Sequence, residues 1–420
     1  MFSNNRFSQI RNSKEAKVLI KNFSYLTILQ VSNYIFPFIT LPYLARVLGV
    51  DAFGLLAIGT AIIAYFQTLI DYGFNYSSVR DIARCKDDKF EINRIVSETL
   101  FSRIFLLLVS IAIITIALFA IPFFKANSSI IICSSTLLIG YAFTTEWFFQ
   151  AVEDMRFITI TSVFSNLIFT LLVFVLVKEK SDYLLQPILN AIGIIISSSI
   201  SWYVIRKRFC IQLYKPNFKF VWKRLKDGFD LFISLFFPTI YSNLNTLLLG
   251  SYNGKTATGI YSGGAKFTSI AYSLTMLFSR VFYPYLSRSI DKHKMYAIVS
   301  LSLGLVLSLI FYFGAEIMVQ LLLSPEFKDS VAVLKIVSFA PLAMSVYNVY
   351  GTNYLALQGG EKYLRNIVIG TTVFGICAGI YCAVEYSYKG VAFVSIMTQI
   401  IRALASYLCA IKISKTRNNG

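Results

Sequence analysis

The chain of 420 residues is 56% hydrophobic and only 14% charged, with a mean hydropathy of +0.65. Soluble domains usually carry about 25% charged residues, so this composition excludes an ordinary soluble enzyme. The net charge of +18 would suggest a nucleic-acid partner in a soluble protein, but basic cytoplasmic loops explain it in a membrane protein. The sequence therefore predicts an all-α polytopic membrane protein that binds no nucleic acid.

Apolar windows of about 20 residues, the length of a membrane-spanning helix, recur along the whole chain. We predict twelve such helices, at residues 22–45, 53–75, 103–122, 128–150, 157–177, 183–205, 229–250, 263–286, 297–320, 331–356, 365–386 and 389–411. Residues 1–21 are polar and basic, and the first window is long enough to span, so no cleavable signal peptide is expected.

Basic residues then set the orientation of these helices. With the N-terminus inside, the cytoplasmic segments hold 27 Lys and Arg residues and the opposite side holds 7. Cytoplasmic loops of membrane proteins carry the excess of Lys and Arg. Both termini, residues 1–21 and 412–420, are therefore predicted to be cytoplasmic.

The longest basic loop, residues 206–228, divides the chain into an N-lobe at 22–205 and a C-lobe at 229–411. Six helices in each half return the chain to its starting side, so two such halves would be related by an axis along the membrane normal. We predict two pseudo-symmetric six-helix lobes around a central cavity.

Short sequence matches between the halves indicate an internal duplication. AFG at 52–54 matches ATG at 257–259 with an offset of 205 residues, and QAVE at 150–153 matches QGGE at 358–361 with an offset of 208. Each match alone is weak, but two near-equal offsets at distant points of the chain favour duplication.

Prolines within the predicted helices favour a carrier over a channel or a membrane enzyme. Pro37 and Pro42 lie in the first helix and Pro238 in the seventh. Proline removes a backbone hydrogen bond and bends a helix, and in transporters such bends line cavities and allow a lobe to flex. We predict these three residues as hinges; the alternative is that they are simply packed.

Three segments carry a family resemblance: LPYLARVLGVDAFG at 41–54, DYGFNYSSVRDIA at 71–83 and WFFQAVEDMRF at 147–157. The chain resembles the Wzx-type O-antigen flippases, polysaccharide exporters of the multidrug/oligosaccharidyl-lipid/polysaccharide superfamily. The resemblance implies a transporter, not an enzyme, that needs no cofactor. It implies translocation of undecaprenyl-diphosphate-linked oligosaccharide repeat units from the cytoplasmic to the periplasmic leaflet of the bacterial inner membrane, by alternating access.

The resemblance also implies partners. They are membrane lipids, an O-antigen polymerase, a chain-length regulator, and a coupling proton or sodium ion.

Four basic residues inside the predicted helices suit a diphosphate, because desolvating that group without cations would cost many kcal/mol. They are Lys266, Arg280, Lys335 and Arg402. Lys266 and Arg280 lie fourteen residues apart, within about 40° of one helix face. Snorkelling or structural ion pairs are the alternatives for all four. Arg103, at the start of the third helix, is expected to snorkel at the membrane interface.

Amides and tyrosines recur in the predicted helices and suit sugar hydroxyls and sugar CH faces. The candidates are Asn33, Tyr34, Asn243 and Asn245, together with Tyr241, Tyr347, Asn348, Tyr350 and Asn353. The same residue types also join membrane helices to one another, which is the alternative role.

Acidic residues inside the helices point to an ion or to a basic partner. Asp71 and Glu146 occupy similar depths in the second and fourth helices and are candidates for ion coupling or gating, with a structural ion pair as the alternative. RDIAR at 80–84 is predicted to continue as a helix at the membrane surface. The six cysteines form no CxxC pair and His293 is the only histidine, so free thiols and no metal site are expected.

Other functions remain open from the sequence. A lipid II flippase or another lipid-linked glycan flippase would share the superfamily fold, as would a drug or cation antiporter, for which acidic residues deep in the first helix are expected. A membrane glycosyltransferase would need a carboxylate site on a sizeable loop, and an O-antigen polymerase a large periplasmic loop; the sequence shows neither feature.

Overall fold

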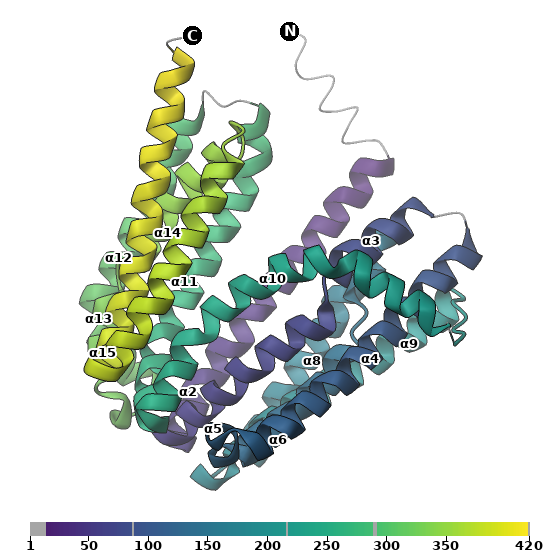
Figure 1. Cartoon of the computed structure of the whole chain (residues 1–420), viewed down its shortest axis with the longest axis horizontal. Helices are drawn as coiled ribbons and strands as arrows, with labels where there is room; N and C mark the ends of the chain where they lie inside the picture. Colours follow the sequence, from purple (N-terminus) through teal and green to yellow (C-terminus); the bar gives the residue numbers. More distant parts are fainter. Residues whose placement is uncertain (1–13, 86–87, 216, 289–291, 419–420) are drawn as a thin grey trace. The chain divides into compact units, whose positions relative to one another are not determined.

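The protein is described by a computed structural model that covers residues 14–85, 88–215, 217–288 and 292–418 (Figure 1). Within these residues the ordered structure is helical and contains no strand. Packing divides the chain into two compact units: unit 1 is Met1–Thr40 with Ile62–Ile240, and unit 2 is Leu41–Ala61 with Tyr241–Gly420. Each unit is considered by itself.

The prolines lie where the chain passes between these packing units. The first passage falls between Pro37 and Pro42, and another comes directly after Ile240, two residues beyond Pro238. Residues 41–61 belong to the predicted N-lobe but pack with unit 2. Residues 229–240 belong to the predicted C-lobe but pack with unit 1. The hinge role of the prolines, and the lobe boundaries expected from the sequence, stay predictions.

Unit 1 consists of long helices joined by short breaks. Its elements are both ends of α2 (Lys14–Asp71), α3 (Phe74–Arg84), α4 (Lys89–Ala120), α5 (Pro122–Ala126), α6 (Ser128–Ala142), α7 (Glu146–Ala151), α8 (Met155–Leu176), η1 (Lys180–Leu184), α9 (Leu185–Arg208) and the first part of α10 (Phe218–Tyr252). Helix α4 begins fourteen residues before the predicted start, because Asp88 accepts hydrogen bonds from the backbone N–H groups of Phe90 and Glu91 and caps the helix there.

The core of unit 1 explains one of the sequence motifs. Trp147, Phe148 and Phe149 of α7 are each 1% exposed and pack with Ile82 of α3 and Ile205 of α9. The short helix α7 is therefore the aromatic centre of this end of the unit, and it fixes the positions of the helices that contact it.

Unit 2 has its own core and irregular helices. Its elements are the middle of α2, the end of α10, α11 (Gly254–Arg288), α12 (His293–Leu322), η3 (Pro325–Phe327), α13 (Ser330–Val337), α14 (Ala340–Val346), the π-helix η4 (Tyr347–Leu355) and α15 (Glu361–Asn418). Gly49 in α2 and Ser387 in α15 leave the helical conformation, with φ of 74° and 51°. The turn predicted between the last two helices thus lies at Ser387.

A reciprocal close contact in unit 2 matches the proposed duplication. A Cβ atom on Gly54 would collide with the carbonyl of Lys255, and a Cβ atom on Gly259 would collide with the carbonyl of Val50. Gly54 and Gly259, and likewise Val50 and Lys255, are each separated by 205 residues. Two segments that contact each other through the same pair of positions form a self-complementary interface, as related repeats do. Glycine is needed at both places because the backbones touch.

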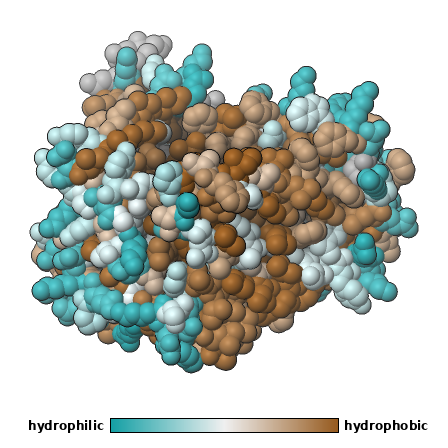
Figure 2. All heavy atoms as spheres, turned by 60° about the horizontal axis from the view of Figure 1, so that its bottom comes forward, coloured by the Kyte–Doolittle hydropathy of each residue, from teal (hydrophilic) through white to brown (hydrophobic). Residues whose placement is uncertain are grey.

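The outer surface of the helices is suited to lipid. Among the residues that the structure describes, eight helices are long and apolar enough to cross a membrane, or nine if the bent pair Phe218–Ile240 and Ser242–Tyr252 is one span. Large apolar side chains such as Phe119, Phe313 and Ile317 are exposed, and Figure 2 shows a broad hydrophobic area on one face. The prediction of an all-helical multi-pass membrane protein is confirmed; the count of twelve and the side of each terminus stay predictions.

The basic loop between the predicted lobes is bound tightly to unit 1. The backbone N–H of Gln212 donates to Asn93 Oδ1 at 3.1 Å, and that of Tyr214 donates to Ser97 Oγ at 3.3 Å. Val221 and Leu225 of α10 are buried, so the first turns of α10 present an apolar face to the unit. The loop is therefore a structured part of unit 1.

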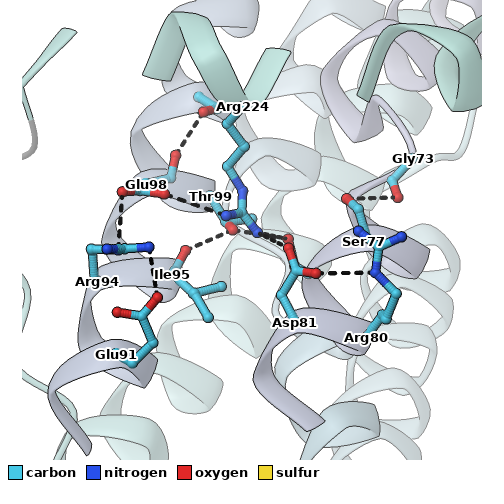
Figure 3. Close-up of polar contacts among 12 residues, drawn as sticks. Gly73, Ser77, Arg80, Asp81, Glu91, Arg94, Ile95, Glu98, Thr99 and Arg224 are labelled. Atoms are coloured by element: carbon cyan, nitrogen blue, oxygen red, sulfur yellow. Dashed lines mark hydrogen bonds and ion pairs between the residues drawn. The ribbon is translucent and has the colours of Figure 1, made fainter. Parts of the chain in front are cut away.

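Arg224 of α10 fixes this attachment. Its guanidinium lies between two acids, 3.3 Å from Glu98 of α4 and 3.5 Å from Asp81 of α3, and it donates to Ser78 Oγ at 3.0 Å (Figure 3). Arg94 contacts the other oxygen of Glu98 at 3.5 Å. The side chain of Arg224 is 12% exposed and that of Glu98 is 8% exposed, so the charges depend on one another for compensation.

We predict that Arg224→Ala destabilises the protein by about 3 kcal/mol, because it leaves Glu98 buried beside a single weaker partner. Thermal unfolding of the detergent-solubilised protein measures the effect. Lys223→Ala, one residue earlier and exposed, is the matched control and should change stability by less than about 0.5 kcal/mol. Equal unfolding temperatures for the two variants would contradict the anchoring role.

Candidate functional site

Two breaks in the helices of unit 1 create the candidate site. The first follows Asp71, where Tyr72 and Gly73 both have positive φ, 44° and 77°, before α3 begins at Phe74. A positive φ is strained for tyrosine, and here the ring of Tyr72 stacks on Phe232 of α10 at 4.6 Å. Residues 80–84 are helical as predicted, but they belong to this separate helix.

The second break separates α6 from α7. Helix α6 ends at Ala142, and Glu146 is the first residue of α7. The carbonyls at the end of α6 lose their partners within the helix, and in the interior of a membrane protein other groups must satisfy them.

Arg103 of α4 interacts with polar groups at both breaks. Its guanidinium contacts Asp71 Oδ1 at 2.5 Å and donates to the carbonyls of Tyr141 at 2.9 Å and Thr144 at 2.7 Å, and to Thr144 Oγ1 at 3.0 Å. The side chain is 1% exposed. The expectation that Arg103 snorkels at the interface is therefore wrong, because α4 begins at Lys89 and carries Arg103 about 21 Å along the helix.

A polar pocket with a volume of about 460 Å³ adjoins this ion pair. Every lining residue except Ile194 has a polar side chain. The lining consists of Asn33, Gln67, Asp71, Asn75, Tyr141, Thr144, Thr145, Glu146, Thr161, Ser162, Ser165, Asn166, Asn190, Ile194, Ser197, Ser198 and Ser201. All of these residues belong to unit 1, and they come from α2, α3, α6, α7, α8, α9 and the break after α6. We call it the unit 1 pocket.

Some of the lining groups are paired and others are available to a ligand. Asn166 donates to Asn33 Oδ1 at 3.1 Å, and Asp71 is held by Arg103. Within the described part of the chain, the side chains of Gln67, Asn75 and Asn190 make no hydrogen bond, and Glu146 makes neither a hydrogen bond nor an ion pair. The pocket therefore combines one acid in an ion pair, one acid outside any ion pair, and three amides that make no hydrogen bond within the described residues.

The sequence located this site only in part. It identified Asp71, Glu146 and Asn33, which the structure brings into one pocket, and Asn75 joins them across the break after Asp71. It missed Gln67, Asn166 and Asn190. A signal was present: Asn190, Ser197, Ser198 and Ser201 repeat on one face of α9, and Ser162, Ser165 and Asn166 on one face of α8.

The predicted cations of unit 2 have different environments. Lys266 of α11 and Lys335 of α13 are exposed, and in the described residues neither forms an ion pair. Arg402 of α15 donates to Thr371 Oγ1 at 3.1 Å and lies 5.8 Å from the centre of the Tyr347 ring. The side chain of Arg280 lies outside the described residues.

The predicted sugar contacts outside the pocket are a mixed set. Asn245 donates to the hydroxyl of Tyr261 at 3.3 Å, Asn243 donates to Ser242 Oγ at 3.2 Å, and the hydroxyl of Tyr34 donates to Gln30 Oε1 at 3.4 Å. These amides and hydroxyls are partly accessible. The side chain of Tyr241 lies outside the described residues.

Two candidates in the π-helix are buried instead. Asn353 is inaccessible and donates to the carbonyl of Ser279 at 3.2 Å and to the hydroxyl of Tyr296 at 2.8 Å, so it joins η4 to α11 and α12. Asn348 is 1% exposed. Neither amide reaches a ligand in this structure, because both face the packing between helices.

Two relatives cover most of the chain. A "putative O-antigen transporter" of Escherichia coli (strain K12) is 27% identical over 85% of this chain and 88% of its own length. A "putative O-antigen transporter" of Shigella dysenteriae is 28% identical over 91% of this chain and 98% of its own length.

Solved structures show the fold. An inward-closed conformation of the lipid II flippase MurJ is similar with a TM-score of 0.68 and 15% identity, over 94% of this chain and 90% of that one. An inward-facing multidrug resistance MATE family transporter of the MOP superfamily is similar with a TM-score of 0.66 and 14% identity, over 94% of this chain and 99% of that one.

The profile of the polysaccharide biosynthesis protein family matches residues 19–290. The resemblance seen in the three sequence segments is thereby confirmed, and the chain belongs to the polysaccharide biosynthesis protein family, with the fold of MOP-superfamily transporters.

Proposed function

We propose that the protein is a flippase that moves undecaprenyl-diphosphate-linked oligosaccharide repeat units, the O-antigen units, across the bacterial inner membrane. The observation that carries this proposal is the similarity, over 85% and 91% of the chain, to two proteins each named putative O-antigen transporter. The direction would be from the cytoplasmic to the periplasmic leaflet, by alternating access. An O-antigen polymerase and a chain-length regulator would act on the product.

We propose twelve spans for this transporter, and the helix lengths support that number. Helices α2 and α15 each have 58 residues, about 87 Å at 1.5 Å per residue, which far exceeds a hydrocarbon core of about 30 Å. Each is interrupted once, at Gly49 or Ser387, and would form two spans. With the spans that contain α10 and α11 the total is twelve, and both termini would then be cytoplasmic.

The diphosphate requires cations because each buried charge costs many kcal/mol when it is unpaired. Lys266 is suited to this need: it is exposed, it forms no ion pair within the described residues, and it lies in the predicted eighth span. Arg280, Lys335 and Arg402 remain proposed contacts of the same group. Nε of Arg402 donates to Thr371 Oγ1, and a guanidinium has further N–H donors on its two terminal nitrogens.

Ion coupling is proposed for Glu146. The carboxylate of Asp71 is paired with Arg103 at 2.5 Å, whereas Glu146 lines the unit 1 pocket, interacts electrostatically with Arg103 and forms no ion pair in the described residues. A carboxylate in this position can bind a proton or a sodium ion and release it when the unit changes conformation.

We predict that Lys266→Ala abolishes long-chain O-antigen in cells that depend on this protein, because the diphosphate loses a compensating charge. Lys266→Arg should restore part of the activity. The lipopolysaccharide ladder on a gel measures the outcome, and an immunoblot verifies the amount of protein. Lys255→Ala is the control, since Lys255 is half exposed and paired with Asp51 at 3.2 Å. A normal ladder in Lys266→Ala cells would remove this residue from the site.

We predict that Glu146→Gln removes the dependence of transport on the proton or sodium gradient and leaves thermal stability unchanged. Asp71→Asn should instead lower the unfolding temperature, because Arg103 loses its charge partner. Flux in proteoliposomes under an imposed gradient measures the first effect. Unchanged gradient dependence in Glu146→Gln would rule out this residue as the coupling group.

A further inference from the structure

The unit 1 pocket is larger and richer in neutral polar groups than ion coupling requires. Resting on the proposed function, we infer that the unit 1 pocket is a saccharide subsite, which receives a neutral or amino sugar of the translocated glycan. The sequence suggested sugar contacts along several helices; the structure brings three amides that make no hydrogen bond within the described residues, Gln67, Asn75 and Asn190, into this one pocket.

The chemistry of the wall favours a polyol. Each sugar hydroxyl both donates and accepts a hydrogen bond, and side-chain amides do the same with their NH₂ and C=O groups. Gln67, Asn75 and Asn190 make no hydrogen bond within the described residues, so their amides can pair with a sugar in full. Ser162 and Ser165 add hydroxyls on α8. A site lined by polar groups discriminates strongly against a ligand that leaves those groups without hydrogen bonds.

The volume favours the same ligand. About 460 Å³ lies within the range of roughly 300 to 1,000 Å³ that small-molecule pockets occupy. A proton needs no such space, and a sodium ion with its ligands would fill only part of it. A sugar ring with its substituents uses both the space and the polar wall.

The charge of the pocket excludes the other half of the substrate. The pocket holds two acids, Asp71 and Glu146, and its adjoining cation, Arg103, is already bound to Asp71. A diphosphate finds no uncommitted cation among these lining groups, whereas a neutral sugar needs none and an amino sugar can pair with a carboxyl group. The glycan and the phosphates of one substrate would therefore be recognised by chemically different parts of the protein.

The experiment measures how fast a cysteine in the pocket reacts with N-ethylmaleimide. Ser162→Cys, a nearly isosteric change on the pocket wall, is made in full-length protein whose six native cysteines are replaced by serine or alanine. Ser269→Cys, exposed one turn after Lys266 on α11, is the matched position beside the proposed diphosphate contact. Both variants are reconstituted in proteoliposomes. They are then labelled with N-ethylmaleimide in three conditions. The first contains undecaprenyl diphosphate that carries the O-antigen repeat unit, the second contains undecaprenyl diphosphate alone, and the third contains neither lipid.

The repeat-unit lipid, at about four times its Kd, should slow labelling of Ser162→Cys about fivefold, whereas undecaprenyl diphosphate alone should not. Both lipids should slow labelling of Ser269→Cys. If both lipids protect only the α11 position, the saccharide subsite is wrong and the flippase proposal stands. If neither lipid protects either position, the flippase proposal fails.

A cation site would give a different result. Protection of Ser162→Cys by sodium chloride, relative to potassium chloride and to the same extent as by the glycan, would overturn the saccharide assignment. Ser165→Cys, on the same face of α8, repeats the measurement if Ser162→Cys does not fold. The same pattern of protection at this second position supports the subsite, and its absence there contradicts it.

Discussion

Unit 1 depends on the interaction of one buried guanidinium with two broken helices. A helix that stops inside a membrane protein exposes carbonyl groups, and each unsatisfied buried group costs about 1 to 3 kcal/mol. Arg103 donates to the carbonyl of Tyr141 in the last turn of α6 and to that of Thr144 in the break after it, and it holds the carboxylate of Asp71 at the end of α2. The breaks in turn allow Asp71, Asn75 and Glu146 to face one space. Without Arg103 the polar pocket would have neither its shape nor its charge balance.

The rest of the structure separates two tasks that the proposed substrate imposes. The exposed cations Lys266 and Lys335 lie in unit 2, and the pocket lined by amides, hydroxyls and the two acids Asp71 and Glu146 lies in unit 1. A single cationic cleft would bind the phosphates of any polyprenyl lipid equally well. A second place that recognises hydroxyl groups adds a difference in affinity between lipids with and without a glycan, which is what specificity requires.

Composition and apolar periodicity predicted the membrane class and most helix positions, because a span must be apolar over about 20 residues wherever it lies. They failed where polar contacts decide the backbone. Windows of apolar residues passed through the breaks after Asp71 and Ala142, since neither break contains a proline. They placed Arg103 at an interface because the cap formed by Asp88 lies in a polar stretch outside any apolar window. Asn190 and Ser198 share a polar face of α9 that the sequence already shows, but that this face lines a pocket becomes visible only when α8 and α9 pack together.

The reciprocal contact of Gly54 and Gly259 bears on how such a chain could arise. Each glycine meets the backbone of the other segment at equivalent positions, so one surface serves as both partners of the contact. A chain of half this length with the same glycine would present a surface complementary to itself and would pair with a second copy around a twofold axis. Joining two such copies end to end preserves that pairing within one polypeptide, and the fused halves are then free to diverge, one toward neutral amides and the other toward lysines.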